Sequence, residues 1–402
     1  MKYASIVGWG KYVPERILSN QDIEKVVNTS DEWIYSHTGI RERRIAAPDE
    51  TVATMSVAAS RAALRVAAVE PTDLDLIIVG TSSPDYLLPG AASIVQDELG
   101  AHHAAAFGLR SGCSSFVYGL AVGTQFIASG TYRHVLVIGA EIISKFLDWH
   151  DRRTCVLFGD GAGAVVLQPS NEPTGLLTCQ LGSDGAGCNA LYIPGGGSKH
   201  PFSQEVLDQG WHRIQMDGRR ILKFAIRTPA EAALKALAAA DLSPADVSLL
   251  IPQQSNVRLI GSICRQLGLA EEKALVNVDK YGNMSAASIP VALCEAAEEG
   301  RIEPGDHVLL LAFGAGLTWA AAVVTWGVPE LRVSWQIPWE LIRRRVPVGT
   351  ATDMAHGARA ALFAAATVPF GVVGSLREEA WMRLLRLLRG IAAALRSALK
   401  ME

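Results

Sequence analysis

Short, continuous apolar runs alternate along this chain with alanine-rich stretches in which apolar residues recur at helical spacing. In the first half, residues 56–68 are predicted to form a helix and residues 76–79 the buried strand that follows it. In the second half, residues 229–240 and 249–251 are predicted to form the same pair of elements. This alternation of helices and buried strands is typical of the α/β fold class.

Two matches relate one half of the chain to the other. The segment 71–78 resembles the segment 244–251, and the segment 134–140 resembles the segment 307–313. Both matches occur at the same shift of 173 residues. Apolar strands resemble one another by chance, but a shift shared by two separate matches favours an internal duplication.

The duplication predicts two similar α/β halves, residues 1–172 and 173–327, related by a pseudo-twofold axis. Their sheets are expected to form a layered αβαβα arrangement, with helices between and outside them. The junction between two such halves is a natural place for an active site.

The composition describes a globular chain, because 49% of its 402 residues are hydrophobic, 19% are charged and the net charge is −3. This balance excludes a disordered protein and gives no reason to expect a nucleic-acid partner. The six cysteines include no Cys-x-x-Cys pair, and the first residues lack a long apolar signal core. We therefore expect a cytoplasmic location, where most of these thiols are small buried hydrophobic groups.

Cys113 is the cysteine whose surroundings indicate chemistry. It follows a predicted strand at residues 104–109 and opens an apolar, helix-compatible stretch, so it lies at a strand-to-helix turn. Unpaired amides and the positive end of a helix favour an anion, so the thiol is expected to be rich in nucleophilic thiolate. Its neighbours within residues 111–115 are serine and glycine, small enough for a substrate to approach. The alternative is a buried structural cysteine.

The duplication places a second turn-to-helix element opposite Cys113. A shift of 173 residues carries Cys113 to Ala286, within the segment 281–288. A pseudo-twofold axis would bring Asn283 close to Cys113 at the junction, with its amide able to hold a second substrate. The alternative is that Asn283 is a local turn residue, because Gly-Asn is a common turn pair.

Five motifs in order carry a specific resemblance to a known family. They are residues 29–34 (TSDEWI), residues 38–43 (TGIRER), Cys113, residues 157–164 (LFGDGAGA) and residues 281–283 (YGN). Over residues 1–327 the chain resembles β-ketoacyl-acyl carrier protein synthase III, a thiolase-fold condensing enzyme of bacterial fatty-acid biosynthesis. The resemblance implies that Cys113 takes an acyl group from acyl-coenzyme A. Malonyl-acyl carrier protein then loses carbon dioxide, and the resulting carbanion attacks the thioester.

The same resemblance implies roles for three further residues. Trp33 and Arg152 are implied contacts for the adenine end of coenzyme A, and Arg258 for the acidic carrier protein. The alternatives are a packed aromatic residue at Trp33 and ordinary surface charges at the two arginines. The family further implies a homodimer, with no metal and no cofactor other than the coenzyme A thioester that is a substrate.

The chain departs from the family pattern at Gln253, where the family has a catalytic histidine. With Asn283, that histidine donates hydrogen bonds to the malonyl thioester oxygen and so stabilises the enolate. A glutamine amide can donate a hydrogen bond but cannot exchange a proton. A misaligned donor would cost ~10²–10³ in condensation rate while leaving acyl loading on Cys113 largely intact.

Three functions therefore remain open. The favoured one is a decarboxylating synthase that tolerates Gln253. The second is an acyltransferase that passes the Cys113-bound acyl group to an amine, hydroxyl or thiol. The third is a non-catalytic partner subunit that binds acyl chains or carrier protein.

Residues 328–402 extend beyond the resemblance and carry an excess of basic residues. Within residues 378–400, apolar residues at helical spacing are interleaved with arginines, which predicts a basic amphipathic helix. A membrane-spanning helix is not expected in this segment, because Pro369 interrupts its longest uncharged run. The predicted helix packs on the enzyme body or across a dimer, with a peripheral membrane or partner contact as the alternative.

Overall fold

The computed structural model describes residues 3–327, so the predicted tail at residues 328–402 lies outside the described residues. Two large sheets organise the described part. The first has the order β1 (Tyr3–Tyr12), β7 (Asp160–Ser170), β6 (Val135–Ile142), β4 (Leu76–Gly80) and β5 (Ala105–Leu109). The second has the order β8 (Gly175–Ser183), β13 (Thr318–Thr325), β12 (His307–Gly314) and β11 (Leu249–Pro252).

The two sheets repeat the same strand pairing. β4 and β6 are parallel, with Leu76 opposite Val135, and β11 and β12 are parallel, with Leu249 opposite Val308. Each strand of the second pair is shifted by 173 residues from its counterpart. The antiparallel neighbour β7 of β6 corresponds to the antiparallel neighbour β13 of β12. The register therefore confirms the predicted duplication.

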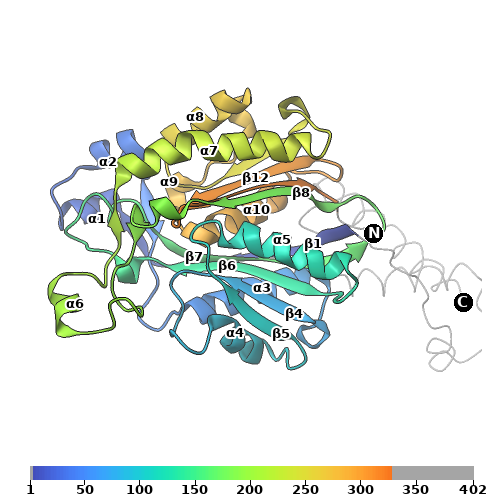
Figure 1. Cartoon of the computed structure of the whole chain (residues 1–402), viewed down its shortest axis with the longest axis horizontal. Helices are drawn as coiled ribbons and strands as arrows, with labels where there is room; N and C mark the ends of the chain where they lie inside the picture. The colour runs from blue at the N-terminus through green and yellow to red at the C-terminus, as the bar shows by residue number, and fades with distance from the viewer. Residues whose placement is uncertain (1–2, 328–402) are drawn as a thin grey trace, which may run out of the picture. The chain divides into compact units, whose positions relative to one another are not determined.

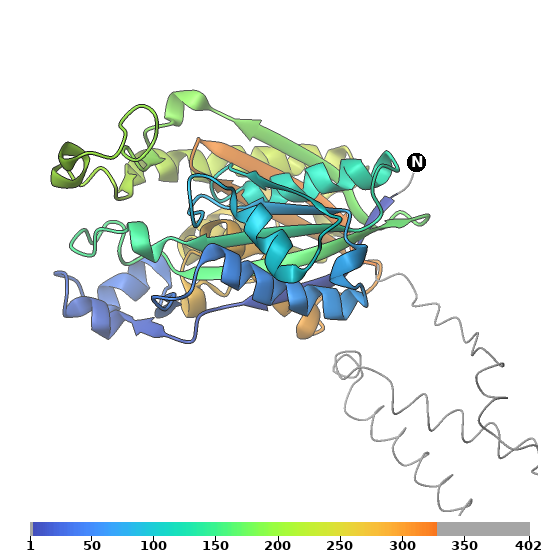
Figure 2. The ribbon, with the colours of Figure 1, turned by 90° about the horizontal axis from the view of Figure 1, so that it is seen from below.

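Helices form three of five layers (Figure 1). The outer pairs are α3 (Val52–Ala67) with α4 (Ala91–Leu99) and α7 (Gly218–Ala238) with α8 (Val257–Leu267), and the central pair is α5 (Ser115–Ala128) with α10 (Ser288–Glu298). Figure 2, seen from below, shows α3 and α4 covering the outer face of the first sheet. The predicted αβαβα thiolase fold is thus confirmed.

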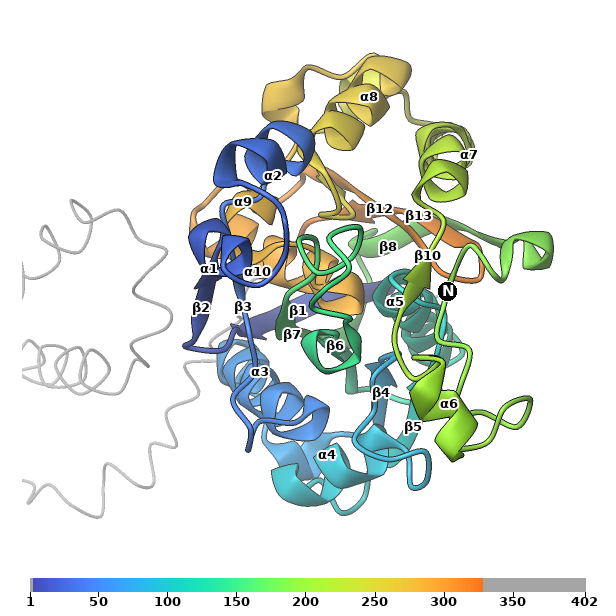
Figure 3. The same cartoon turned by 90° about the vertical axis from the view of Figure 1, so that its left-hand side faces the viewer.

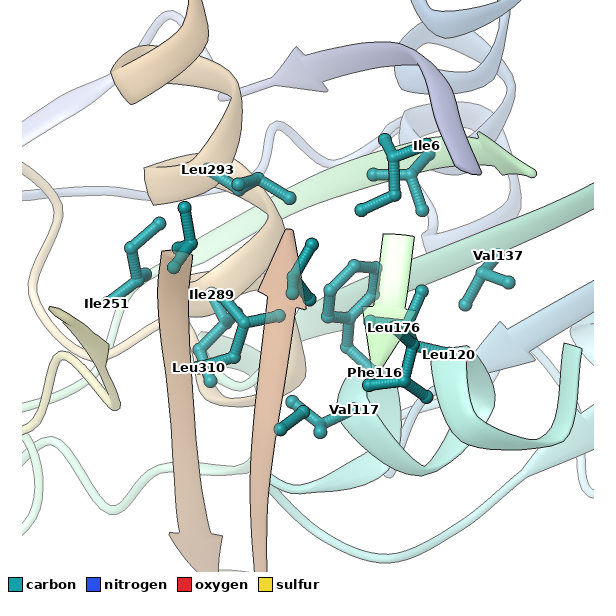
Figure 4. Packing of buried hydrophobic residues seen from close by; sticks show 14 of the residues in the cluster. Ile6, Phe116, Val117, Leu120, Val137, Leu176, Ile251, Ile289, Leu293 and Leu310 are labelled. Atoms are coloured by element: carbon teal, nitrogen blue, oxygen red, sulfur yellow. The ribbon is translucent and has the colours of Figure 1, made fainter. Parts of the chain in front are cut away.

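The central helices lie in a core shared by both halves. Phe116 and Leu120 of α5 pack in one cluster with Ile289 and Leu293 of α10 and with Leu310 of β12 (Figure 4). All five side chains are buried. Burial of a large apolar side chain stabilises the fold by about 1.5–3 kcal/mol, so this cluster holds α5 and α10 together.

Two predicted helices begin earlier in the structure. The one predicted at 56–68 begins at Val52, because Thr51 and Thr54 form a capping box. The one predicted at 229–240 begins at Gly218, where Asp217 accepts hydrogen bonds from two backbone N–H groups of the first turn. Pro229, the predicted first residue of this helix, lies inside α7. Proline lacks an N–H donor but fits a helix when tertiary packing compensates for the lost bond.

Smaller elements complete the described chain. They are α1 (Asn20–Glu24), α2 (Asp31–Thr38), α6 (Gln204–Asp208), α9 (Val278–Tyr281), β2 (Ile17–Ser19), β3 (Glu42–Arg44), β9 (Leu191–Tyr192) and β10 (Gln215–Met216). Short 3₁₀ turns include η1 (Pro71–Asp73), η2 (Ser144–Phe146), η3 (Gly185–Gly187), η4 (Pro244–Asp246), η5 (Glu271–Lys273) and η6 (Ser285–Ala287). Within residues 3–327, no helix has the length and apolar character needed to cross a membrane.

Candidate active site

Cys113 lies in the turn between β5 and α5, as the sequence predicts, and is 6% exposed. Ser114 is the N-cap residue of α5. Gly112 has a φ of +56°, and a Cβ atom there would lie 2.9 Å from the carbonyl oxygen of Ala315. Glycine is therefore required by both the backbone conformation and the close approach of the loop after β12.

Asn283 and Gln253 meet at the same junction. Gln253 directly follows β11, and Asn283 lies between α9 and η6. The Gln253 Nε2 group donates to Asn283 Oδ1 at 2.8 Å. Both side chains are buried, at 1% and 8% exposure. The two residues at the positions predicted to face the malonyl thioester oxygen are thus in direct contact.

Ser285 connects these two residues to Cys113. Its backbone N–H donates to Asn283 Oδ1 at 2.9 Å, and its carbonyl oxygen accepts from Gln253 Nε2 at 3.1 Å. Its hydroxyl lies 3.3 Å from the sulfur of Cys113. Ser285 was not predicted as a site residue, although the 173-residue shift aligns it with Gly112. Both have left-handed backbones, with φ of +51° at Ser285.

The hydrogen bonds determine how the two amides are oriented. The backbone N–H of Ser285 can only donate, so the Asn283 atom beside it must be the oxygen. That oxygen then requires the NH₂ group of Gln253, whose two hydrogens are used by Asn283 and by the Ser285 carbonyl. Gln253 Oε1 is left buried without a partner among the described residues. The Asn283 NH₂ group has no acceptor within residues 3–327 and remains a donor for a ligand.

The electrostatics of Cys113 differ from the sequence-based expectation. Burial raises the pKa of the Cys113 thiol to about 11. The Ser285 hydroxyl and the N–H groups of Cys113 and Ala315 favour the thiolate, but the nearby Glu141 carboxylate opposes it. The expectation of a thiolate-rich cysteine is therefore wrong for this structure, because loss of hydration outweighs the donors at the helix start.

Glu141 is a fully buried acid in β6 and contacts the hydroxyl of Ser285. Its carboxylate accepts hydrogen bonds from the Ser83 hydroxyl at 2.6 Å and from the Ser82 N–H at 3.1 Å. The Thr81 and Ser285 hydroxyls donate to it at 3.3 and 3.1 Å. Burial raises the pKa of Glu141, whereas these four donors oppose the increase.

Trp33 and Arg152 form a stack of flat groups with His37. The guanidinium carbon of Arg152 lies 4.8 Å from the Trp33 ring centroid, and the His37 ring stacks on Trp33 at 4.5 Å. The structure therefore brings together the two predicted coenzyme A contacts. Planar groups of this kind can exchange one stacking partner for an adenine base.

Arg258 occupies the second position of α8 and is exposed. It borders a surface cavity of about 470 Å³ between α2 and α8, together with Tyr35 and Arg41. Asn256 caps α8 and donates to the His37 carbonyl oxygen of α2 at 2.7 Å. Figure 3 shows α2 and α8 side by side, so Arg258 and the Trp33 stack lie on neighbouring elements.

Comparison with known proteins identifies the family. The model for 3-oxoacyl-[acyl-carrier-protein] synthase III matches residues 107–185, and the model for its C-terminal part matches residues 237–326. The β-ketoacyl-[acyl-carrier-protein] synthase III of Roseiflexus sp. is 50% identical over 324 residues, which are 81% of this chain and 98% of the relative. The chain belongs to the β-ketoacyl-[acyl-carrier-protein] synthase III family.

Further synthase III proteins agree with this assignment. The Desulfitobacterium hafniense protein is 52% identical over 81% of this chain and 98% of its own length. The Thermus thermophilus structure has 45% identity and a TM-score of 0.76, covering 81% of this chain and all of that one. The Aquifex aeolicus structure has 43% identity and a TM-score of 0.75, covering 80% and 100%. As a member of the synthase III family, the chain is a condensing enzyme of the acyltransferase class.

Proposed function

We propose that this synthase III family member loads an acyl group from acyl-coenzyme A onto Cys113 and condenses it with malonyl-acyl carrier protein. The observation that carries the proposal is the junction of the two halves, where Ser285 contacts Cys113, Asn283 and Gln253 together. A nucleophile and an unused amide donor therefore face one buried site. This is the arrangement that a two-step acyl transfer through a covalent intermediate requires.

Acyl loading uses the groups around the sulfur. The Cys113 sulfur attacks the thioester carbonyl, and the N–H groups of Cys113 and Ala315 beside it can stabilise the negative oxygen that forms. Gly314 leaves the room for this step, because a Cβ atom there would lie 2.8 Å from the sulfur. The acyl group remains on Cys113 when coenzyme A departs as a thiol.

Condensation depends on the donors that face the malonyl thioester. We assign this role to the free NH₂ group of Asn283. Gln253 stands at the position of the family's histidine, but both of its amide hydrogens are already used. One well-placed oxyanion donor contributes ~10²–10³ in rate, so we expect decarboxylation to be slower here than with a histidine.

A second acceptor chemistry is favoured by one observation. The Oε1 atom of Gln253 is buried and has no hydrogen-bond partner among the described residues. An amine or hydroxyl acceptor could donate to this atom while attacking the Cys113 thioester. The alternative function is therefore a non-decarboxylating acyltransferase that uses the same acyl-enzyme.

The substrates are assigned to the surface on α2 and α8. We propose that the adenine of coenzyme A stacks on Trp33 and Arg152, which already adopt a stacked geometry. Arg258 is exposed and forms no ion pair with the residues described, so its charge is free for an acidic carrier protein. The reaction scheme needs no metal or prosthetic group, since the coenzyme A thioester is a substrate.

We further propose a cytoplasmic homodimer. β5 is the edge strand of the first sheet, and Phe107 on it is 36% exposed. The loop after β4 presents Leu87 and Leu88, which are 70% and 88% exposed. An unpaired strand edge beside exposed apolar residues suits pairing with a second copy. The six free cysteines agree with a reducing compartment.

The proposed function is tested by mass spectrometry of the protein and its products. Incubation with acyl-coenzyme A should add the acyl mass to Cys113, and malonyl-carrier protein should then release a β-ketoacyl product. Cys113→Ala should gain no acyl mass, whereas the control Cys179→Ala should behave as the wild type. A wild-type protein that never gains the acyl mass would leave only the non-catalytic partner subunit. Transfer to another acceptor without carbon dioxide release would favour the acyltransferase.

A further inference from the structure

The contacts of Cys113 raise the question of where its proton goes. The thiol is held in the protonated form by burial, yet its sulfur must attack as a thiolate. Gln253 cannot take the proton, because a primary amide is not a base at neutral pH. The side-chain oxygen in hydrogen-bond contact with the sulfur, among the described residues, is the Ser285 hydroxyl at 3.3 Å.

We propose that Ser285 and Glu141 form a proton relay that receives the Cys113 proton during acyl loading. The proposal rests on the proposed function, since it assumes that Cys113 is the acyl acceptor. Ser285 touches the reacting sulfur and is therefore a catalytic residue. Glu141 acts through Ser285 and is a positioning residue.

The geometry of Ser285 carries the inference. A serine hydroxyl has one hydrogen to donate and lone pairs to accept with. Its oxygen lies 3.3 Å from the Cys113 sulfur and 3.1 Å from Glu141 Oε1, and all three residues are buried. The hydroxyl can therefore accept from the thiol while it donates to the carboxylate. The left-handed backbone of Ser285, with φ of +51°, directs the side chain between these two partners and is uncommon outside glycine.

Glu141 is the final proton acceptor of this relay. Its neighbours are the Thr81, Ser83 and Ser285 hydroxyls and the Ser82 N–H, all of which donate to its oxygens. No basic side chain pairs with it among the described residues. Among the described residues, the titratable group influenced by its charge at this site is Cys113. With these neighbours, Glu141 is placed to accept a proton from Cys113 through Ser285, not to form a salt bridge.

During acyl loading, the Cys113 proton moves along this relay. The sulfur of Cys113 forms a bond to the thioester carbonyl carbon as its S–H bond breaks, and its proton passes to the Ser285 oxygen. The original Ser285 proton passes to the Glu141 carboxylate. When the bond between carbon and the coenzyme A sulfur breaks, the relay of Glu141 and Ser285 returns a proton to the leaving sulfur. Coenzyme A departs as a thiol, and Ser285 and Glu141 are restored.

Removing either relay group should slow acyl loading and change its pH dependence. The variants are Ser285→Ala and Glu141→Gln, and the matched control is Ser288→Ala, a buried serine whose hydroxyl has no partner within residues 3–327. At neutral pH, each variant should load acyl groups about 100-fold more slowly, which is the lower end of the range for acid–base catalysis. The control should keep the wild-type rate.

The pH profile separates a relay from a structural role. The wild-type loading rate should level off through neutral pH, whereas both variants should gain about tenfold per pH unit, because each must form the thiolate by loss of its proton to solvent. The double variant should be no slower than the slower single variant, since each single substitution already interrupts the same proton relay. Melting temperatures establish that each variant is folded, and the Michaelis constant for acyl-coenzyme A should not change.

Two outcomes would overturn the relay. One is a folded Ser285→Ala variant that loads acyl groups at the wild-type rate. The other is a pair of slower variants that keep the wild-type pH profile. Either result requires that the wild type gain the acyl mass, so it is distinct from failure of the proposed function, in which no acyl-enzyme forms at all.

Discussion

At the residue scale, the site is decided by which atoms are already paired. Gln253 is contacted by Asn283 and Ser285, so its amide supports the site without facing it as a donor. The sequence could locate Cys113 and Asn283 from the strand-to-helix turns and the 173-residue shift, and Gln253 from the family resemblance. It could not reveal that Gln253 Nε2 is fully used or that Ser285 is the common contact, because both facts depend on side-chain geometry across distant segments.

Gln253→His should restore the donor that the family uses. An imidazole that donates to the malonyl thioester should raise decarboxylation and condensation about 10-fold or more. Acyl loading should hardly change, because the Cys113 contacts are unaltered. Product release and acyl-enzyme formation can be followed separately by mass spectrometry.

The matched variant for this experiment is Gln253→Leu, which keeps a similar volume and offers no donor. It should show no gain. A folded Gln253→His protein with unchanged or lower condensation would instead indicate a pocket adapted to another acceptor, in line with the unpartnered Oε1 of Gln253.

Cys113 should also make stability depend on pH. Its folded-state pKa is about 11, above the ordinary value of 9.0, so the folded protein binds the thiol proton more tightly than the unfolded chain. This contribution is present below pH 9 and is lost as the pH rises from 9 to 11. By pH 10 the loss should reach about 1.4 kcal/mol, the equivalent of one pKa unit.

The measurement compares thermal unfolding of the wild type and Cys113→Ala at pH 8 and pH 10. The wild type should lose more stability than the variant over this interval, because the other buried thiols are common to both proteins. Equal losses would show that Cys113 is not held as a buried thiol.

At the element scale, α2 and α8 bring two substrate surfaces together. Asn256 caps α8 and also reaches the His37 carbonyl of α2, so one side chain connects the two helices. The sequence predicted Trp33, Arg152 and Arg258 only by family resemblance. Their shared location depends on this contact between residues 219 positions apart. The helix start predicted at Pro229 is also too late. α7 begins at Gly218, where Asp217 caps it, and it continues through Pro229.

Arg258→Glu tests the carrier-protein surface on α8. The reversed charge should raise the Michaelis constant for the malonyl-carrier protein, and the effect should shrink at high salt. Acyl loading from acyl-coenzyme A should be nearly unchanged. Glutamate is tolerated near a helix N-terminus, so the helix itself should remain folded.

Arg61→Glu is the matched control, because Arg61 is an exposed arginine on α3 in the opposite outer layer. It should leave the kinetics for both substrates at wild-type values. If Arg258→Glu has the same Michaelis constant as the control at low salt, Arg258 does not bind the carrier protein.

At the scale of the whole molecule, duplication explains both what was predictable and what was not. The repeated β4–β6 and β11–β12 pairs could be inferred from the 173-residue shift. The layer order follows from placing two such units together. The boundaries at residues 172 and 327 stay predictions, as does the basic helix within residues 378–400, which lies outside the described residues.

Dimer formation through β5 is a prediction at this scale. Phe107→Lys should weaken pairing of the edge strand, because a charged residue opposes association of two strand edges. Sedimentation should show a dimer for the wild type and a larger monomer fraction for the variant. Phe202→Lys, which changes an exposed phenylalanine outside this sheet, should sediment as the wild type does. A monomeric wild type would contradict the homodimer directly.

The shared register has a consequence for how such a site could arise. In a symmetric ancestor made of two identical chains, any change at one turn would appear at both. Joining the copies into one polypeptide lets equivalent positions diverge: Glu141 in β6 corresponds to Gly314 in β12, and Gly112 corresponds to Ser285. An acid at 314 would occupy the space of the Cys113 sulfur, since even a Cβ atom there would lie 2.8 Å from it. Covalent fusion therefore allows one copy to supply the acid and the other to leave the space empty.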